Sequence, residues 1–366
     1  MSRTEPRILI AAGGTGGHLF PALAIADELK RMRPSAEILF VGTKEKIETR
    51  IVPQRGYAFQ TIWISGLHRR LTIENLLFPL KVCVSLLQSF FLIRRFQPHA
   101  VIGTGGYVCG PVLYVASLIN IPVFIHESNS FPGVTTRMLA GRAERVYIAF
   151  EVSKRWLKRT DHVELVGTPT RESLGTIPAA EGRKFFQLDP ARKTVLVMGG
   201  SLGAASINTA VLDMLDTVIA ADIQLIWQTG KADFERIKSV VGEKRFAWLG
   251  PFIDTMEYAL GAADVVVCRA GATTIAELTR TGKPAILIPY PHAAADHQTH
   301  NAQSLVDAGA ALMIADTEVR SKLGTAVLQL VNDQNRLSDM STAATRFGRP
   351  KAATTIAEQI LKAIQE

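Results

Sequence analysis

Two copies of one local pattern, nearly 190 residues apart, constrain the fold more than any other feature of this chain. Residues 7–18 read RILIAAGGTGGH and residues 193–203 read KTVLVMGGSLG; each is a short apolar run that leads into a glycine-rich turn and then a helical pattern. A strand, a glycine turn and a helix open a Rossmann-like βαβ unit. The pattern therefore predicts helices over about 18–32 and 204–219, and two Rossmann-like α/β domains in tandem.

Shorter apolar runs predict the other strands of both domains. They cover 38–41, 100–102, 123–125 and 145–148 in the first half, and 223–227, 247–249, 265–267, 285–288 and 311–314 in the second. Solid apolar runs are typical of parallel strands that are covered on both faces. A stretch without periodicity, rich in glycine and proline, places the domain boundary between Val166 and Arg183, and a final helix is predicted over about 351–364.

The net charge and the hydropathy pattern indicate which kinds of partner the chain binds and in which compartment it works. The 366 residues carry a formal net charge of +8, which favours an anionic partner such as a nucleotide, a nucleic acid or an anionic lipid. The three cysteines are far apart in apolar surroundings, as expected of reduced thiols in a cytosolic protein. The chain opens without a signal-peptide pattern. Its longest apolar stretch, Leu76–Ile93, is interrupted by Lys81 and Gln88, which argues against a membrane span.

Three glycine-rich turns follow predicted strands and are candidate anion sites. The first, Gly13–His18, has four glycines in five positions, more than a tight turn requires, and its amide N–H groups can converge on a phosphate at the start of a helix. It is not a dinucleotide fingerprint, because Leu19 stands at the third glycine position, and no Gly-Lys-Ser/Thr follows it. The turns at 103–107 and 199–203 share its character. Together the three would line one cleft between the domains.

Polar side chains follow three other predicted strands. His126–Asn129 follows the strand at 123–125, and segment 268–277 follows the strand at 265–267. There Thr273 or Thr274 is expected to cap a helix, and Glu277 is placed near its first turn, where it would accept hydrogen bonds from a ribose diol or simply compensate the helix dipole. The cluster at 289–302 suits sugar hydroxyls. Its histidines lack metal-ligand spacing and the chain has no Asp-x-Asp, so no metal is expected.

These motifs resemble, in order and spacing, those of the MurG family of bacterial transferases. The matching segments are GGTGGH, GGYV-C-GP, HE-S-N, G-T-P-T-R, GGSLGA, CRAGATTIAE and DHQTHNA, which span essentially the whole chain. The family transfers N-acetylglucosamine (GlcNAc) from UDP-GlcNAc to undecaprenyl-pyrophosphoryl-MurNAc-pentapeptide, with inversion, in peptidoglycan synthesis. The resemblance implies the GT-B fold: one Rossmann-like domain at 1–168, joined by a returning C-terminal helix at 349–366, faces a second at 169–348 across a cleft.

The resemblance also implies the substrate contacts, position by position. Ser201 and its loop would hold the diphosphate with Arg171 nearby, and the Ile253 backbone would read the uracil edge. Glu277 would take the ribose hydroxyls and Gln298 the GlcNAc hydroxyls. The other donor contacts implied are Thr15, Gly16, Gly17, Asn129, Ala272, Thr273, Thr274, Ile275 and Ala276. The acceptor side comprises Gly105, Gly106 and Tyr107, together with His18 and Glu127.

Inverting transfer needs a base for the acceptor's 4-hydroxyl. His18 is favoured because an imidazole titrates near neutrality, and Glu127 is the alternative. The chain departs from the usual family residues at four positions, of which only the first removes a polar contact near the donor: Leu202 for Gln, Ser128 for Gln, Cys109 for Ser and Thr168 for Asn.

The acceptor's polyprenyl tail remains in the bilayer, so a membrane-contacting surface is expected. The region Leu67–Phe96 is rich in leucine and phenylalanine and is flanked by Arg69, Arg70, Arg94 and Arg95. Apolar residues rimmed with cations suit an anionic membrane surface, which predicts a peripheral protein on the cytoplasmic face of the inner membrane. The alternative is a buried helix with solvated arginines.

Other functions remain open from the sequence alone. They are another GT-B transferase acting on a diacylglycerol or an aglycone, a UDP-GlcNAc 2-epimerase, and a non-catalytic nucleotide-binding module. The broken fingerprint disfavours an NAD-dependent oxidoreductase. Neither a cofactor nor a nucleic-acid partner is expected.

Overall fold

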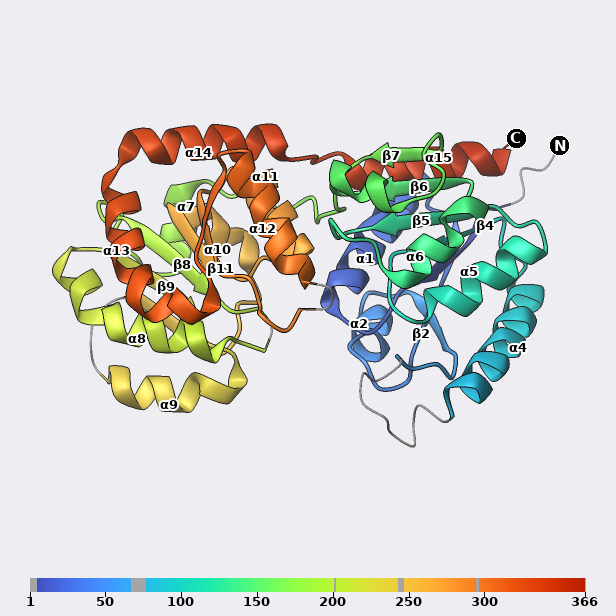
Figure 1. The fold of residues 1–366 in the computed structure, drawn as a ribbon, viewed down its shortest axis with the longest axis horizontal. Helices are drawn as coiled ribbons and strands as arrows, with labels where there is room; N and C mark the ends of the chain where they lie inside the picture. The colour runs from blue at the N-terminus through green and yellow to red at the C-terminus, as the bar shows by residue number, and fades with distance from the viewer. Residues whose placement is uncertain (1–4, 67–76, 201, 243–246, 294–295, 366) are drawn as a thin grey trace. The chain divides into compact units, whose positions relative to one another are not determined.

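The chain divides into two compact units, each built on its own parallel sheet (Figure 1). The computed structural model describes residues 5–66, 77–200, 202–242, 247–293 and 296–365. Unit 1 comprises Met1–Thr170 and Pro350–Glu366, and unit 2 comprises Arg171–Arg349. The predicted α/β architecture with two parallel-sheet domains is confirmed.

The sheet of unit 1 has seven strands in the order β3-β2-β1-β4-β5-β6-β7, and every neighbouring pair is parallel. This order reverses direction between β1 and β4, which is where doubly wound sheets bind ligands at the carboxyl ends of their strands. The strands are β1 (Arg7–Ala11), β2 (Glu37–Gly42), β3 (Ala58–Thr61), β4 (Ala100–Gly103), β5 (Val123–Glu127), β6 (Arg145–Ile148) and β7 (Val163–Leu165).

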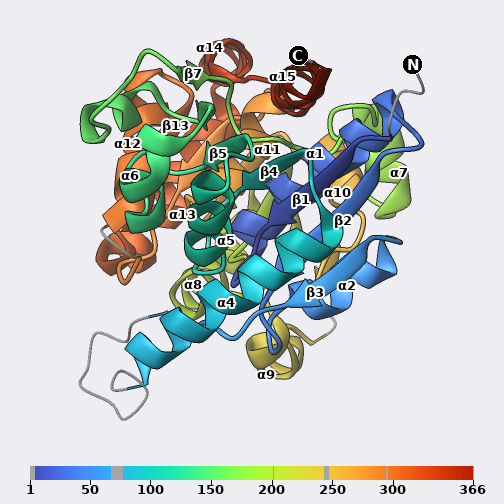
Figure 2. The same ribbon diagram turned by 90° about the vertical axis from the view of Figure 1, so that its right-hand side faces the viewer.

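Helices cover both faces of this sheet. The helices α4 (Phe78–Phe96), α5 (Cys109–Leu118) and α6 (Val134–Leu139) share one apolar core on one face (Figure 2). The helices α1 (Gly16–Met32) and α15 (Ala352–Gln365) share the core on the other face, next to α2 (Glu48–Gln54). The C-terminal helix α15 is fixed to unit 1 by hydrogen bonds from Thr354 Oγ1 to Glu28 (2.7 Å) and from Gln359 Nε2 to Glu164 (2.8 Å).

Unit 2 repeats this plan with six parallel strands in the order β10-β9-β8-β11-β12-β13. The strands are β8 (Thr194–Met198), β9 (Gln224–Gln228), β10 (Ala247–Gly250), β11 (Val265–Cys268), β12 (Ala285–Leu287) and β13 (Ala311–Met313). The helices are α7 (Ala179–Phe185), α8 (Ala205–Ala220), α9 (Lys231–Val241), α10 (Met256–Ala262), α11 (Ala272–Arg280), α12 (His297–Asp307), α13 (Val319–Asn332) and α14 (Gln334–Phe347).

The strands that the sequence did not predict are the two edges of the first sheet, β3 and β7. Both are short and only partly buried, so neither produces the solid apolar run that identifies the interior strands. All the other strands lie where apolar runs predicted them.

Candidate active site

The first glycine turn leads directly into α1, which begins at Gly16 with Thr15 as its N-cap. The first backbone donor inside the helix is His18 N–H, so the amides of Gly16 and Gly17 point out of the helix N-terminus, where an anion is favoured. The Gly14 amide, by contrast, donates to the buried carboxylate of Glu48 at 3.2 Å. Only part of this turn can therefore serve a ligand.

The turn after β4 packs tightly against the first turn and brings the predicted acceptor-side residues together. Gly105 has φ +116°, and a Cβ on it would lie 2.3 Å from Nδ1 of His18. A Cβ on Gly106 would lie 2.2 Å from the carbonyl oxygen of Gly13. Glycine is required at both positions because the imidazole and the backbone occupy that space. The ring of Tyr107 is 60% exposed beside them.

The buried side chain of Cys109 supports the turn after β4 from the protein interior. Its buried thiol lies 3.1 Å from the carbonyl oxygens of both Ala11 and Gly105, so its one S–H can donate to either of them. Burial raises the pKa of the Cys109 thiol to about 12, so it stays protonated and acts as a donor. The cysteine at this position thus provides the same kind of hydrogen bond that a serine hydroxyl would provide.

Glu127 ends β5 with both carboxylate oxygens already engaged. Oε1 accepts from Asn129 N (3.0 Å), and Oε2 accepts from Gly133 N (2.9 Å) and from Thr136 Oγ1 (2.7 Å). Gly133 is the N-cap of α6, so the carboxylate holds the start of that helix and the loop that carries Asn129. This arrangement suits a residue that fixes a loop better than one that collects a proton.

His126 is buried beside Glu127 and remains neutral. Its Nε2 lies 3.0 Å from the carbonyl oxygen of Gly167, and burial lowers the pKa of His126 to about 4. An electrostatic interaction with His18 also contributes to this lowering, which places the two imidazoles near each other.

The second glycine turn follows β8 in unit 2. Ser201, the predicted diphosphate contact, lies outside the described residues. In the same turn, a Cβ on Gly203 would lie 2.1 Å from the carbonyl oxygen of Thr229. From the segment after β9, a Cβ on Gly230 would lie 2.3 Å from the carbonyl oxygen of Leu202. The turn is therefore held against the end of β9 by two close glycine approaches. The Leu202 side chain is 87% exposed.

Glu277 lies in the second turn of α11, so the prediction that placed it near the first turn is wrong. The helix begins at Ala272 with Gly271 as its N-cap, and neither threonine caps it. Burial raises the pKa of Glu277 to about 7, while the nearby charge of Arg171 acts in the opposite direction. A carboxylate this far into the helix compensates little of the dipole, which leaves the ribose role as the better interpretation.

Two further predicted donor contacts are partly engaged within unit 2. Gln298 Oε1 accepts from Ala270 N (3.2 Å) and Tyr290 N (3.0 Å), which fixes the orientation of this side chain. The Ile253 amide donates to Gln228 Oε1 at 3.0 Å. The carbonyl of Ile253 is therefore the backbone group that remains to meet a nucleobase. The hydroxyl of Thr273 is buried and makes no hydrogen bond among the described residues.

The comparisons with known proteins cover both units. The family model described as glycosyltransferase family 28 N-terminal domain matches residues 8–148, and the C-terminal domain model of the same family matches residues 194–359. Curated relatives named UDP-N-acetylglucosamine–N-acetylmuramyl-(pentapeptide) pyrophosphoryl-undecaprenol N-acetylglucosamine transferase match over nearly the whole chain. That of Salinibacter ruber is 43% identical over 99% of this chain and 98% of its own, and that of Chlorobaculum tepidum is 45% identical over 97% and 98%.

This chain belongs to the MurG family. A crystal structure of Acinetobacter baumannii MurG matches with a TM-score of 0.77 and 26% identity over 98% of this chain and 99% of that one. A UDP-N-acetylglucosamine 2-epimerase matches with a TM-score of 0.70 at 14% identity, over 98% of this chain and 95% of that one, which shows a shared fold alone.

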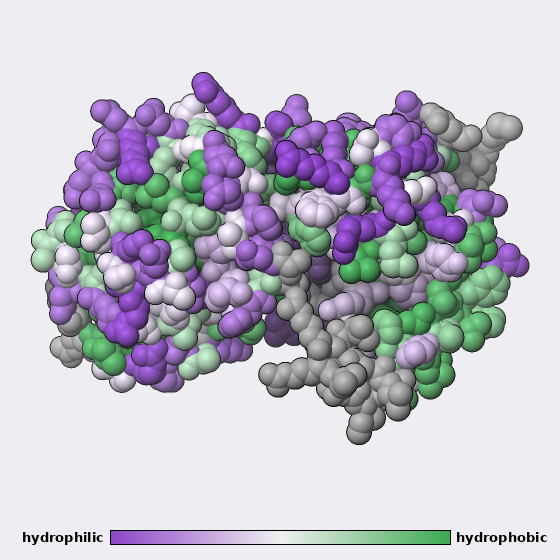
Figure 3. Space-filling model, viewed as in Figure 1, coloured by the Kyte–Doolittle hydropathy of each residue, from purple (hydrophilic) through white to green (hydrophobic). Residues whose placement is uncertain are grey.

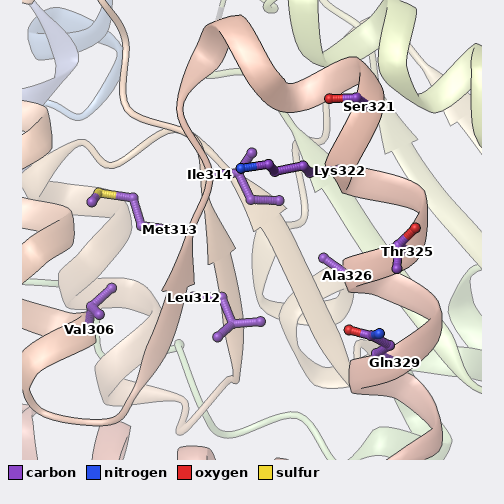
Figure 4. A pocket seen from close by; sticks show the side chains of 9 residues that line it. All are labelled: Val306, Leu312, Met313, Ile314, Ser321, Lys322, Thr325, Ala326 and Gln329. Carbon is purple, nitrogen blue, oxygen red and sulfur yellow. The ribbon is translucent and has the colours of Figure 1, made fainter.

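A cavity of about 560 Å³ lies elsewhere in unit 2, between α12, β13 and α13 (Figure 4). Its lining is largely apolar and includes Leu312, Ile314 and Ala326, with Lys322 at the side. None of the predicted site residues lines it. Among the described residues, no group of three or more His, Cys, Asp or Glu side chains is placed to hold a metal ion.

Three residues that organise the site escaped the sequence prediction. Glu48 reaches the first glycine turn from α2, and Gln228 reaches the second from β9. Arg269 forms an ion pair with Asp316 (2.6 Å) and donates to the backbone carbonyl of Pro289, which fixes the segment before α12. Gln228 and Arg269 each stand at the end of an apolar run, which is the signal that the sequence offers for them, whereas Glu48 stands among other charged residues.

Proposed function

We infer that this chain transfers GlcNAc from UDP-GlcNAc to the 4-hydroxyl of lipid-linked MurNAc-pentapeptide, a step of peptidoglycan synthesis. The observation that carries this inference is the 39–45% identity, over nearly the full length, to relatives whose names state both substrates. Attack on the anomeric carbon from the face opposite UDP gives inversion, with UDP as the leaving group.

Unit 2 supplies the donor half of the site in this proposal. The turn around Ser201 and the guanidinium of Arg171 stabilise the diphosphate as it leaves, because amide donors and a fixed cation favour the growing negative charge. Glu277 accepts hydrogen bonds from the ribose hydroxyls. Gln298 and the unpaired Thr273 hydroxyl meet the sugar, and the Ile253 carbonyl accepts from uracil.

Unit 1 supplies the acceptor half, with His18 as the base. The engaged oxygens of Glu127 support this choice, because each would have to give up a hydrogen bond before it could take a proton. Replacing His18 by alanine is expected to lower kcat at least about 100-fold, the usual loss when a general base is removed, while donor affinity stays nearly intact. If Glu127→Gln produced that loss and His18→Ala did not, the assignment would be reversed.

The helix α4 supports a peripheral membrane contact for this unit. Its buried residues are Ser85, Ser89 and Ile93, whereas Leu87 is 60% and Phe91 67% exposed. A helix that buries serines and exposes large apolar side chains does not behave as a core helix, which argues against the buried-helix alternative. Figure 3 shows this apolar surface over α4.

Residues 67–76 of the predicted region lie outside the described part of the chain. Among the described residues, no helix is long and apolar enough to cross a membrane. We therefore propose that α4, with Arg94 and Arg95 in its last turn, rests on an anionic membrane surface at the cytoplasmic face.

The deciding experiment is transfer of radiolabelled GlcNAc to a synthetic lipid-linked MurNAc-pentapeptide, with product linkage determined. Formation of a β-1,4-linked disaccharide supports the proposal. Conversion of UDP-GlcNAc to UDP-N-acetylmannosamine, or to its hydrolysis products, without transfer would indicate an epimerase. Bound but unconverted UDP-GlcNAc would indicate a nucleotide-binding module.

A further inference from the structure

One buried amide joins two of the segments that the proposed function assigns to UDP. Gln228 is the last residue of β9 and is 2% exposed. Its Nε2 donates to the carbonyl oxygen of Gly200 at 2.9 Å, and its Oε1 accepts from Ile253 N at 3.0 Å. Gly200 stands next to Ser201 in the second glycine turn, and Ile253 follows β10. A single side chain thus connects the diphosphate loop to the backbone that reads the base.

A buried amide at this position needs a reason, because the three residues that precede it, Leu225–Trp227, are apolar and fully buried. Burying an amide is unfavourable unless its donors and acceptor are paired. Here the partners among the described residues are the backbones of two loops. Gly200 is exposed and has φ +88°. The turn can therefore face a ligand while the buried Gln228 side chain holds the Gly200 carbonyl from the protein interior.

The hydrogen bond between the Ile253 amide and Gln228 also decides which backbone group of Ile253 can meet the nucleobase. Since the Ile253 amide is engaged by Gln228, the carbonyl is the group that remains. A carbonyl oxygen accepts from the N3–H of uracil but repels cytosine, whose N3 is itself an acceptor. The direction of that carbonyl therefore sets the preference for uracil over cytosine.

We propose that Gln228 is a positioning residue that holds the diphosphate loop and the base-reading backbone in register, and so sets both affinity and base selectivity for UDP. The proposal rests on the proposed function, because it takes the donor to be a uridine diphosphate sugar. Gln228 touches no substrate in this account and acts through Gly200 and Ile253.

The test compares Gln228→Leu with Gln224→Leu. Gln224 begins the same strand, is 5% exposed, and pairs its amide with the backbone of Asp189, at 3.1 Å to the nitrogen and 2.8 Å to the oxygen. It is therefore a matched buried glutamine at the opposite end of β9. Dissociation constants for UDP and CDP are measured by calorimetry on both full-length variants, and their thermal unfolding is recorded.

Loss of two buried hydrogen bonds in Gln228→Leu should weaken UDP binding about 10- to 100-fold and bring the UDP-to-CDP ratio close to one. Gln224→Leu should lower thermal stability to a similar extent while leaving UDP affinity and the ratio unchanged. Unchanged UDP affinity and ratio in Gln228→Leu, or equal losses in Gln224→Leu, would overturn the proposal. A wild-type protein that does not prefer UDP over CDP would instead contradict the proposed donor.

A second variant keeps the test available if Gln228→Leu does not fold. Gln228→Glu, assayed at pH 8.5, retains an acceptor for the Ile253 amide but, as a carboxylate, has no N–H for Gly200. It should keep the preference for UDP over CDP and yet lose most of the affinity that UDP has beyond uridine. If both properties match the wild type, Gln228 does not position the diphosphate loop.

Discussion

Replacing Glu277 by glutamine removes a carboxyl group that is hard to ionise in the folded protein. Burial raises the pKa of Glu277 from 4.5 to about 7, with Arg171 opposing the shift. One pKa unit corresponds to about 1.4 kcal/mol, so ionising this group costs about 3 to 4 kcal/mol more in the folded protein than in the unfolded chain. The ligand-free enzyme carries this penalty at neutral and alkaline pH.

The sign of the effect on stability follows from linkage. A carboxyl group whose folded pKa is raised holds its proton longer in the folded state than in the unfolded state. Its contribution to the free energy of unfolding is therefore greatest below about pH 4.5, declines as the pH rises to about 7, and is level above that. Glu277→Gln should unfold at a higher temperature than the wild type at pH 8 and at nearly the same temperature at pH 5.

Donor binding should show the opposite dependence, because only the carboxylate accepts hydrogen bonds from both ribose hydroxyls. With a pKa of about 7, the dissociation constant of UDP-GlcNAc should rise about tenfold between pH 8 and pH 6. This donor is suitable because its diphosphate is esterified at both ends and does not titrate in that range. In Glu277→Gln the constant should be about 10- to 100-fold higher at pH 8, and independent of pH.

Calorimetric titration with UDP-GlcNAc at pH 6, 7 and 8 measures these constants, and thermal unfolding without ligand measures the stability. Glu318→Gln is the control, since that exposed carboxylate pairs with Lys322 (2.6 Å) on the surface of unit 2. A wild-type affinity that does not change with pH, or a Glu277→Gln profile parallel to the wild type, would refute the ribose role.

Three shorter predictions address the rest of the site. Gly105→Ala should displace the His18 imidazole and lower kcat without changing donor affinity, whereas Gly110→Ala, where an added Cβ meets nothing closer than 3.9 Å, should have no effect on kcat. Replacing Leu87 and Phe91 together by serine should reduce binding to anionic liposomes but spare turnover of a short-chain soluble acceptor; equal losses in both assays would contradict the membrane role. Chelation of divalent cations should leave the transfer rate unchanged, and a loss restored by Mg²⁺ would show that the reaction uses a metal.

The interior of both sheets could be predicted because its residues are fully buried. The strands at the centre, β1 and β8, read as solid apolar runs, and the glycine turns follow each at once. Helix limits were less predictable. The start of α11 was misjudged because threonine is a strong N-cap residue, whereas this helix uses Gly271, which leaves no side-chain signal.

The supporting residues of the site could not be predicted because they act from distant parts of the chain. Glu48 is 34 residues from Gly14, and Gln228 is 28 from Gly200 and 25 from Ile253. Nothing in the local sequence around Glu48 distinguishes it from an ordinary helix-initiating acid. The segment LIWQ does contain a hint, since a glutamine that closes an apolar run must find buried partners.

The distribution of charge gives a physical reason for the two-unit plan. Residues 1–170 and 350–366 hold 23 Lys and Arg against 14 Asp and Glu, whereas residues 171–349 hold 18 against 19. The whole positive excess therefore belongs to unit 1, the unit that also exposes the apolar surface of α4. An anionic membrane surface, as proposed above, would attract unit 1 far more strongly than unit 2. Under the proposed function, this asymmetry would draw unit 1 to the bilayer that holds the acceptor, whereas a uniformly basic chain would also draw unit 2, the proposed donor-binding unit, against the membrane.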